Sequence, residues 1–393
     1  MPASHRLESI DLMRGLVMAL MALDHTRDFF SNAQFDPTDL GQTNAALFLT
    51  RWITHIVAPA FVLLAGTGAY IFKLRRDLTR RQLAWYLITR GFWLIVLELT
   101  LVRFDWTFNW DYHYTGGAVI WALGWSMIVL ASLVFLPRWA ILLFALVTIA
   151  GHNLFDAIHP GDMQPLVWLW TILHVPGSIE YLPGYFFIVM YPLIPWIGVM
   201  AAGFCLGPVF FQAPGTRKTI LLLLGFGFIT AFVILRLNNI YGDPKPWLPQ
   251  KDSLFTLFAV LNCEKYPPSL LYLLITLGLV FLGLALFEWN KLHRYCRPLI
   301  TLGRVPLFFY LIHIPLIHGA ALSFTQLRGL PIDWLFRGSS RLPFPTMPTS
   351  EYGYDLTTVY GIWLLLLTLL YPACYAYAWF KQRHREIQWL TYI

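Results

Sequence analysis

Ten stretches of predominantly apolar residues, each about twenty residues long, follow one another along the chain. A helix needs about 20 such residues to cross the roughly 30 Å hydrocarbon core of a bilayer. Of the 393 residues, 58% are hydrophobic and 12% are charged, whereas about a quarter of an average soluble protein is charged. We therefore predict an all-α polytopic membrane protein with about ten transmembrane helices, in a single domain over 1–393. The stretches lie near 9–30, 48–72, 82–104, 117–136, 139–155, 185–210, 219–240, 267–289, 299–322 and 357–380.

Basic residues are distributed unevenly between the connections on the two sides of this predicted membrane domain. Fifteen lysines and arginines fall on one side and six on the other. Because cytoplasmic connections carry the excess of positive charge, both termini are expected in the cytoplasm. The net charge of +7 then reflects topology, so lipid is an expected partner and nucleic acid is not. The longer connections, expected outside, are 31–47, 105–116, 156–184, 241–266 and 323–356.

The first apolar stretch is unusual because it contains several ionisable side chains. A charge at the bilayer midplane costs about 2.5 to 3.5 kcal/mol on insertion scales, so such residues usually face inward and are paired or functional. Arg14 and His25 are eleven residues apart, which places them on one helix face, about 16 Å apart along the axis. They are suited to two positions along one extended ligand or channel. In the alternative interpretation, Arg14 reaches the lipid interface and pairs with Asp11.

His25 is a candidate general base, because a neutral imidazole accepts a proton at physiological pH. The preceding Asp24 is a candidate to orient it. The second stretch carries Arg51 and His55 on one face, and His55 lies near the same outer end as His25, so the two imidazoles are candidates for one site. A structural histidine that bonds two helices together is the alternative for His25.

Compact catalytic and metal motifs are not found in the sequence. There is no H-E-x-x-H and no G-x-S-x-G, and the four cysteines show no C-x-x-C spacing. We therefore expect no metal, no serine nucleophile and no disulfide framework.

Three further clusters carry polar side chains. Lys265, Tyr266 and Ser269 lie at the outer start of the eighth stretch. Arg304 lies near the cytoplasmic start of the ninth stretch, and His313 lies deeper within it. The run KLRRDLTRR, from residue 73, forms an electropositive patch on the expected cytoplasmic side, which the positive-inside rule alone explains.

Five segments together resemble bacterial members of the heparan-alpha-glucosaminide N-acetyltransferase catalytic-domain family, within the transmembrane acyltransferase superfamily. They are RLESIDLMRGLVMALMALDH, RWITHIVAPAFVLLAGTGAY, YPLIPWIGVMAAGF, KYPPSLLY and GRVPLFFYLIH. The pair Arg14 and His25 is also similar to the R-x10-H pattern of acyltransferase-3 membrane proteins. Lysosomal members carry their active-site histidine in the loop after the first helix, whereas residues 31–47 contain none here. The base is therefore left open between His25 and His55.

The resemblance implies a multi-pass enzyme of the bacterial inner (plasma) membrane. It would move an acyl group, typically acetyl, from cytoplasmic acyl-CoA to a hydroxyl or amine of an extracytoplasmic sugar. Arg14, Arg304 and Arg75 would pair with the phosphates of CoA. The other candidate substrate or CoA contacts are Arg51, Lys265, Tyr266, Ser269 and His313. A transporter or flippase that uses the same buried groups is the alternative, and the oligomeric state is left open, with a homodimer among the alternatives.

Overall fold

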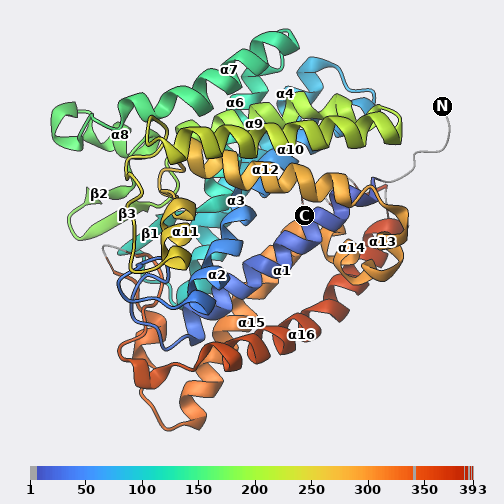
Figure 1. Cartoon of the computed structure of the whole chain (residues 1–393). Helices are drawn as coiled ribbons and strands as arrows, with labels where there is room; N and C mark the ends of the chain where they lie inside the picture. The colour runs from blue at the N-terminus through green and yellow to red at the C-terminus, as the bar shows by residue number, and fades with distance from the viewer. Residues whose placement is uncertain (1–6, 340–341, 385, 388–389, 391, 393) are drawn as a thin grey trace.

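The computed structural model describes residues 7–339, 342–384, 386–387, 390 and 392, and within them the chain is mostly helical. Each of the ten apolar stretches contains a long helix (Figure 1). These helices are α1 (Glu8–Phe30), α3 (Val57–Arg75), α4 (Arg80–Leu97), α6 (Val119–Leu133), α7 (Arg138–Gly151), α9 (Leu193–Leu206), α10 (Pro214–Leu237), α12 (Leu270–Leu286), α15 (Pro306–Leu327) and α16 (Leu356–Arg383). Shorter helices are α2 (Ala45–Ile53), α5 (Arg103–Thr107), α8 (Val167–Leu173), α11 (Ser253–Leu261), α13 (Asn290–Tyr295) and α14 (Arg297–Arg304).

Six helical segments among the described residues are long and apolar enough to cross a membrane. Two other helices, α6 and α12, are apolar but have 15 and 17 residues. The remaining two, α1 and α4, are long enough but carry more charge than a simple membrane anchor. The protein is thus an integral membrane protein, while the count of about ten spans stays a prediction. The six segments are Ala45–Arg75, Arg138–Phe155, Leu193–Phe211, Pro214–Leu237, Pro306–Leu327 and Leu356–Arg383.

A small sheet departs from the prediction of an all-α fold. Its strands β1 (Tyr114–Gly117), β2 (Gly177–Leu182) and β3 (Tyr185–Val189) lie in the order β1-β3-β2. The pair β1 and β3 is parallel, and β2 pairs antiparallel with β3. The sequence predicted helix from residue 185, but aromatic and β-branched residues after Gly184, whose φ is +80°, form a hairpin strand instead. Helix α9 begins only after Pro192.

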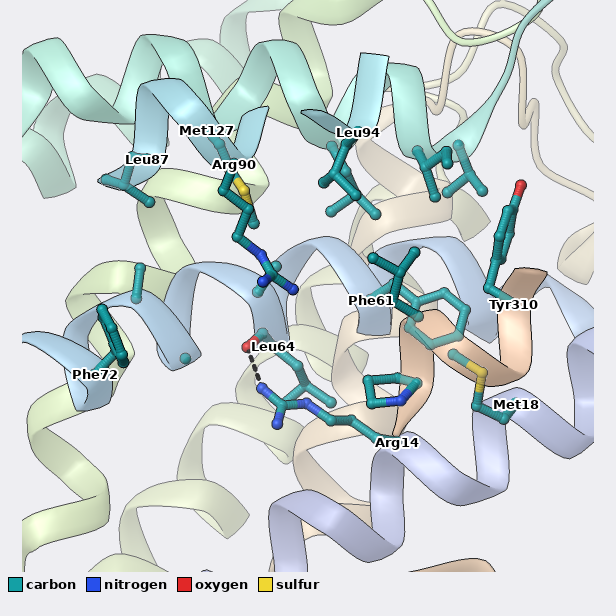
Figure 2. Close-up of a pocket in the computed structure, with 18 of the residues that line it drawn as sticks. Arg14, Met18, Phe61, Leu64, Phe72, Leu87, Arg90, Leu94, Met127 and Tyr310 are labelled. Carbon is teal, nitrogen blue, oxygen red and sulfur yellow. Dashed lines mark hydrogen bonds between the residues drawn. The ribbon is translucent and has the colours of Figure 1, made fainter. Parts of the chain in front are cut away.

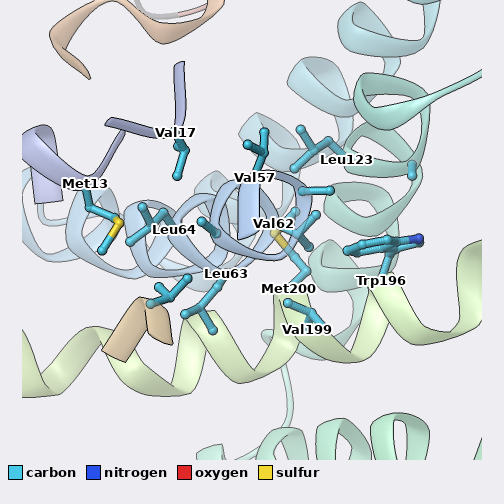
Figure 3. Close-up of a cluster of buried hydrophobic side chains, with 14 of the residues drawn as sticks. Met13, Val17, Val57, Val62, Leu63, Leu64, Leu123, Trp196, Val199 and Met200 are labelled. Atoms are coloured by element: carbon cyan, nitrogen blue, oxygen red, sulfur yellow. The ribbon is translucent and has the colours of Figure 1, made fainter. Parts of the chain in front are cut away.

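Helix α1 lies inside the bundle, where it contacts α3 and α12 as well as α14, α15 and α16 (Figure 1). Its apolar side chains join a large buried cluster with side chains of α3, α6 and α9 (Figure 3). By contrast, α7, α10 and α16 leave large apolar side chains such as Leu143, Phe226 and Leu365 exposed. An apolar outer surface around a bundle is the surface expected to face lipid.

Glycines set the closest helix contacts. A Cβ atom on Gly66 of α3 would lie 2.0 Å from the carbonyl oxygen of Met200 in α9, and one on Gly203 of α9 would lie 2.0 Å from that of Leu63. The Thr67 hydroxyl donates a hydrogen bond to the Gly203 carbonyl at 3.0 Å. Only small residues permit such backbone approach in a membrane bundle. Glycines allow an equally close backbone approach between α1 and α14, so the position of α1 is tightly fixed.

Both ends of the described chain lie at the same end of the bundle. Leu7, just before α1, and Lys381, near the end of α16, line one cavity. Helix α1 therefore runs from this end toward the end where Asp24 and His25 lie.

Candidate active site

A cavity of about 400 Å³ lies at the C-terminal end of α1. Helix α1 contributes the largest group of polar side chains to it. The others come from α2, residues 98–107, α15 and the loops that carry Asp36, Tyr191 and Lys265. Five residues singled out in the sequence are brought together here, namely Asp24, His25, Arg51, Lys265 and Tyr266. Further polar and aromatic lining residues are Arg27, Asp28, Asp36, Glu98, Arg103, Trp106, Tyr191, Tyr310 and Phe344.

His25 is held by a second histidine. Its Nδ1 lies 2.8 Å from Nε2 of His313 in α15, and the two rings stack with their centroids 5.0 Å apart. Trp106 meets the His25 ring edge-on at 5.0 Å. The sequence placed His313 among the substrate contacts, and the structure places it directly against His25.

The hydrogen bonds of His313 define the protonation of this pair. Its Nδ1 lies 2.6 Å from the carbonyl oxygen of Tyr310 and 3.2 Å from that of Phe309. Carbonyl oxygens only accept, so Nδ1 of a neutral His313 carries the hydrogen and its Nε2 accepts from Nδ1 of His25. The remaining nitrogen of His25, Nε2, then has a free lone pair. His313 is buried and His25 is half-buried, and in this arrangement Nε2 of His25 is the nitrogen of the pair that can accept a hydrogen.

Asp24 forms a charge cluster rather than orienting His25. Its carboxylate pairs with Arg51 at 2.5 Å and with Arg27 at 3.0 Å, and it accepts a hydrogen bond from the Thr54 hydroxyl at 3.0 Å. Arg27 also pairs with Asp28 at 2.5 Å. These pairs balance the charges of Asp24, Arg27 and Asp28 and join α1 to α2 beside the cavity.

Lys265 and Tyr266 reach the cavity from the connection between α11 and α12. This connection is anchored by Arg236, at the end of α10, whose guanidinium donates to the carbonyl oxygens of Val260, Lys245, Ala259 and Asn262 at 2.8 to 2.9 Å. The Arg236 side chain is buried and lies 3.7 Å from the carboxylate of Asp243. Sequence reasoning missed this anchor, although a lone arginine at the end of an apolar stretch was a usable signal.

Glu98 is a second residue that sequence reasoning missed. It begins a π-helical segment, η2 (Glu98–Val102), is buried, and accepts a hydrogen bond from the backbone N–H of Trp121 at 3.2 Å. A π-helical segment inside an α-helix frequently marks a functional site. The signal in the sequence was a single acidic residue within the third apolar stretch, 82–104.

Two predicted site residues lie elsewhere. Within the described residues, His55 is buried beside Tyr272, whose hydroxyl donates to the His55 carbonyl at 2.6 Å, and it does not line the cavity. Ser269 caps α12 by accepting from the N–H of Tyr272 and donates its own hydrogen to Asp243 at 2.7 Å. Of the two imidazoles expected at one site, only that of His25 therefore lines the cavity, and Ser269 supports the loop that carries Lys265.

A second cavity, of about 310 Å³, is drawn in Figure 2. Its wall is mostly apolar, but Arg14 and Arg90 extend into it from opposite sides, and Arg14 donates to the carbonyl oxygen of Leu64 at 3.0 Å. Tyr310 and Val119 line both this cavity and the one that contains His25. The two cavities are therefore neighbours with a shared wall.

A third cavity, of about 490 Å³, is rich in basic side chains. Arg75 and Arg76 line it, and Arg14, Arg304 and Lys381 belong both to it and to the apolar cavity. Within the described chain, Nε of Arg304 is buried without a hydrogen-bond partner. The three cavities thus follow one another along α1, from a basic end through an apolar middle to the imidazole pair.

The fold and these cavities define an integral membrane protein with a buried imidazole site. The chain belongs to the heparan-alpha-glucosaminide N-acetyltransferase catalytic family, whose model matches residues 6–235. This confirms the resemblance drawn from the sequence, and the family is one of membrane transferases. No curated protein matches the chain. The matched region contains Asp24, His25 and Arg51, while Lys265 and His313 lie beyond it.

Proposed function

We propose that the protein transfers an acetyl group from acetyl-CoA to a hydroxyl or amine of a sugar, with His25 as general base. The observation that carries this proposal is the bond between His25 and His313, because it leaves Nε2 of His25 as a proton acceptor in the cavity. A general base needs one ring nitrogen with an available lone pair, and the bond to His313 uses only the other nitrogen of His25.

In the proposed reaction, an acceptor hydroxyl or amine attacks the carbonyl carbon of the thioester. A C–O or C–N bond forms, and the C–S bond breaks. The acceptor proton passes to Nε2 of His25 and then to the thiolate of CoA, which leaves as the thiol. Asp28, which lines the same cavity, favours the imidazolium formed in between, whereas Lys265 and Arg27 disfavour it.

The order of the cavities supports acetyl-CoA as the donor. Its phosphates need fixed cations, and Arg75, Arg76 and Arg304 line the basic cavity. The pantetheine arm is less polar and suits the apolar cavity, where Arg14 lies at the junction of the two. The thioester would then reach His25 past Tyr310. The basic end would face the cytoplasm, as the positive-inside rule suggests, and the sugar would bind from the other side.

Turnover with labelled acetyl-CoA tests the proposal. Protein in sealed vesicles is supplied with radiolabelled acetyl-CoA on one side and an amino-sugar acceptor on the other. We expect release of CoA and labelled acceptor only when acetyl-CoA is on the side of the chain termini. Transport of intact acetyl-CoA or of the sugar without acetylation would instead establish the transporter alternative.

Substitutions of Arg14 test separately whether acetyl-CoA binds along the basic and apolar cavities. Arg14→Ala is expected to weaken acetyl-CoA binding by about 1.5 to 3 kcal/mol, the size of a charge-assisted hydrogen bond. Arg14→Lys should recover only part of this loss, because lysine lacks the bidentate fork. Isothermal titration of detergent-solubilised variants measures the effect. Arg138→Ala, at an exposed arginine that lines none of the three cavities, is the matched control. Equal affinities of all four proteins for acetyl-CoA would show that Arg14 does not bind acetyl-CoA.

A further inference from the structure

A histidine, an aspartate and a second histidine converge where α7 ends. His152 and Asp156 lie in and just after the short 3-10 helix η3 (His152–Phe155), and His174 directly follows α8. One potential ligand atom from each residue lies within 4.8 Å of the other two. Nε2 of His174 lies 3.2 Å from a carboxylate oxygen of Asp156. None of these residues lines the cavity that contains His25.

The polar atoms of this cluster are buried without being satisfied. Both histidines are 1% exposed. Among the described residues, neither ring nitrogen of His152 has a hydrogen-bond partner, and Nδ1 of His174 has none. A buried polar group left without a partner is costly. The carbonyl of Pro268 lies near enough to interact with one nitrogen of His152, but the remaining nitrogens around the carboxylate still need an explanation. The ion pair between His174 and Asp156 accounts for only one of the four ring nitrogens.

We propose that His152, Asp156 and His174 bind a divalent transition metal, with Zn²⁺ the ion that best suits two imidazoles and a carboxylate. Zinc binds such ligands at about 2.0 to 2.2 Å, so tetrahedral ligand atoms lie about 3.4 Å apart. His174 and Asp156 lie 3.2 Å apart and already meet this spacing. The ligand atoms lie within 4.8 Å of one another, so His152 needs a shift of at most about 1.4 Å to complete it. Water would take the fourth position.

Supporting contacts around the cluster resemble those of a metal site. The amide of Asn153 donates to the other carboxylate oxygen of Asp156 at 2.8 Å, which orients the carboxylate. The carbonyl oxygen of Pro268 lies near the His152 ring, where it can accept from the nitrogen that does not bind metal. The Asp156 side chain is 23% exposed, which gives an ion access from solvent.

The metal would fasten the connection between α7 and α8 to the start of α12. The Asn153 side-chain oxygen already accepts from the N–H of Leu270 at 2.9 Å, four residues after Tyr266 of the active-site cavity. A bound ion would therefore stabilise the loop that carries Lys265 and Tyr266. This role is structural and does not require that the acetyl transfer proposed above be correct.

Metal content tests the site directly. The full chain is purified through a histidine-free tag, washed with chelator, incubated with Zn²⁺ and desalted. Elemental analysis is expected to find about one zinc per chain in the wild type and about none in His152→Ala or His174→Ala. His159→Ala, at an exposed histidine seven residues after His152, should bind as much zinc as the wild type.

A second variant distinguishes the loss of a metal ligand from a failure of the protein to fold. Asp156→Asn keeps the shape of the side chain, and zinc is expected to raise the melting temperature of the wild type but not of this variant. Cobalt loading of the wild type should also give visible absorption bands of a four-coordinate site with nitrogen ligands. A wild type that binds no zinc and gives no cobalt bands would overturn the proposal. Zinc binding that survives in His152→Ala and Asp156→Asn would overturn it as well.

Discussion

Replacing His25 by alanine is expected to lower the rate of acetyl transfer by about 10²- to 10⁴-fold, the range that a positioned general base contributes. The substitution removes the nitrogen that can accept a proton in the cavity, but it removes no side chain from the basic or apolar cavity. Affinity for acetyl-CoA should therefore stay within about twofold of the wild type. Steady-state turnover of labelled acetyl-CoA measures the first effect, and isothermal titration measures the second.

His55→Ala is the informative comparison, because the sequence left the base open between these two histidines. His55 is buried beside Tyr272, so its replacement should affect stability more than the chemical step. His113→Ala, at a half-exposed side chain paired with Asp111, controls for the loss of any imidazole. An inactive His55→Ala together with an active His25→Ala would transfer the role of base to His55.

Much of the membrane architecture could be predicted from composition and periodicity. A run of apolar residues must be helical in lipid because its backbone polar groups find partners only within the segment. The helical repeat also placed Arg14 and His25 along one face, and the structure puts them in neighbouring cavities. The strand β3 was missed because five apolar residues next to a helix carry no period that separates strand from helix.

The partners within the site could not be predicted in the same way. His25 and His313 are 288 residues apart, and their contact depends on how α1 packs against α15. Asp24 was expected to orient its neighbour His25, but adjacent residues of a helix point about 100° apart, so Asp24 meets Arg51 of α2 instead. His152 and His174 fit no compact motif because the segment between them includes a loop and α8.

Replacing Arg236 by methionine is expected to have the largest effect on stability. The variant leaves four carbonyl oxygens without their donor and leaves Asp243, 1% exposed at its side chain, without its neighbouring cation. Breaking a buried charge pair from one side costs about 3 to 5 kcal/mol. We expect the apparent melting temperature in detergent to fall by about 4 to 6 °C. Activity should fall too, because Lys265 and Tyr266 lie on the loop that Arg236 anchors.

Lys218→Met is the matched control, since it removes an exposed cation from the other end of the same helix α10 and should leave the melting temperature unchanged.

The pH dependence of the melting temperature shows whether the lost stability of Arg236→Met comes from the unpaired charge of Asp243. Burial raises the pKa of Asp243, and Arg236 opposes that rise. Without the arginine, the pKa of Asp243 in the folded variant rises further above its value in the unfolded chain. As the pH falls through the folded pKa, the folded variant is protonated before the unfolded chain is, and the folded variant gains stability. The gap between variant and wild type should therefore narrow at acidic pH, and Arg236→Met combined with Asp243→Asn should recover part of the loss at neutral pH. A gap that is constant with pH and unchanged in the double variant would assign the loss to the four carbonyl groups alone.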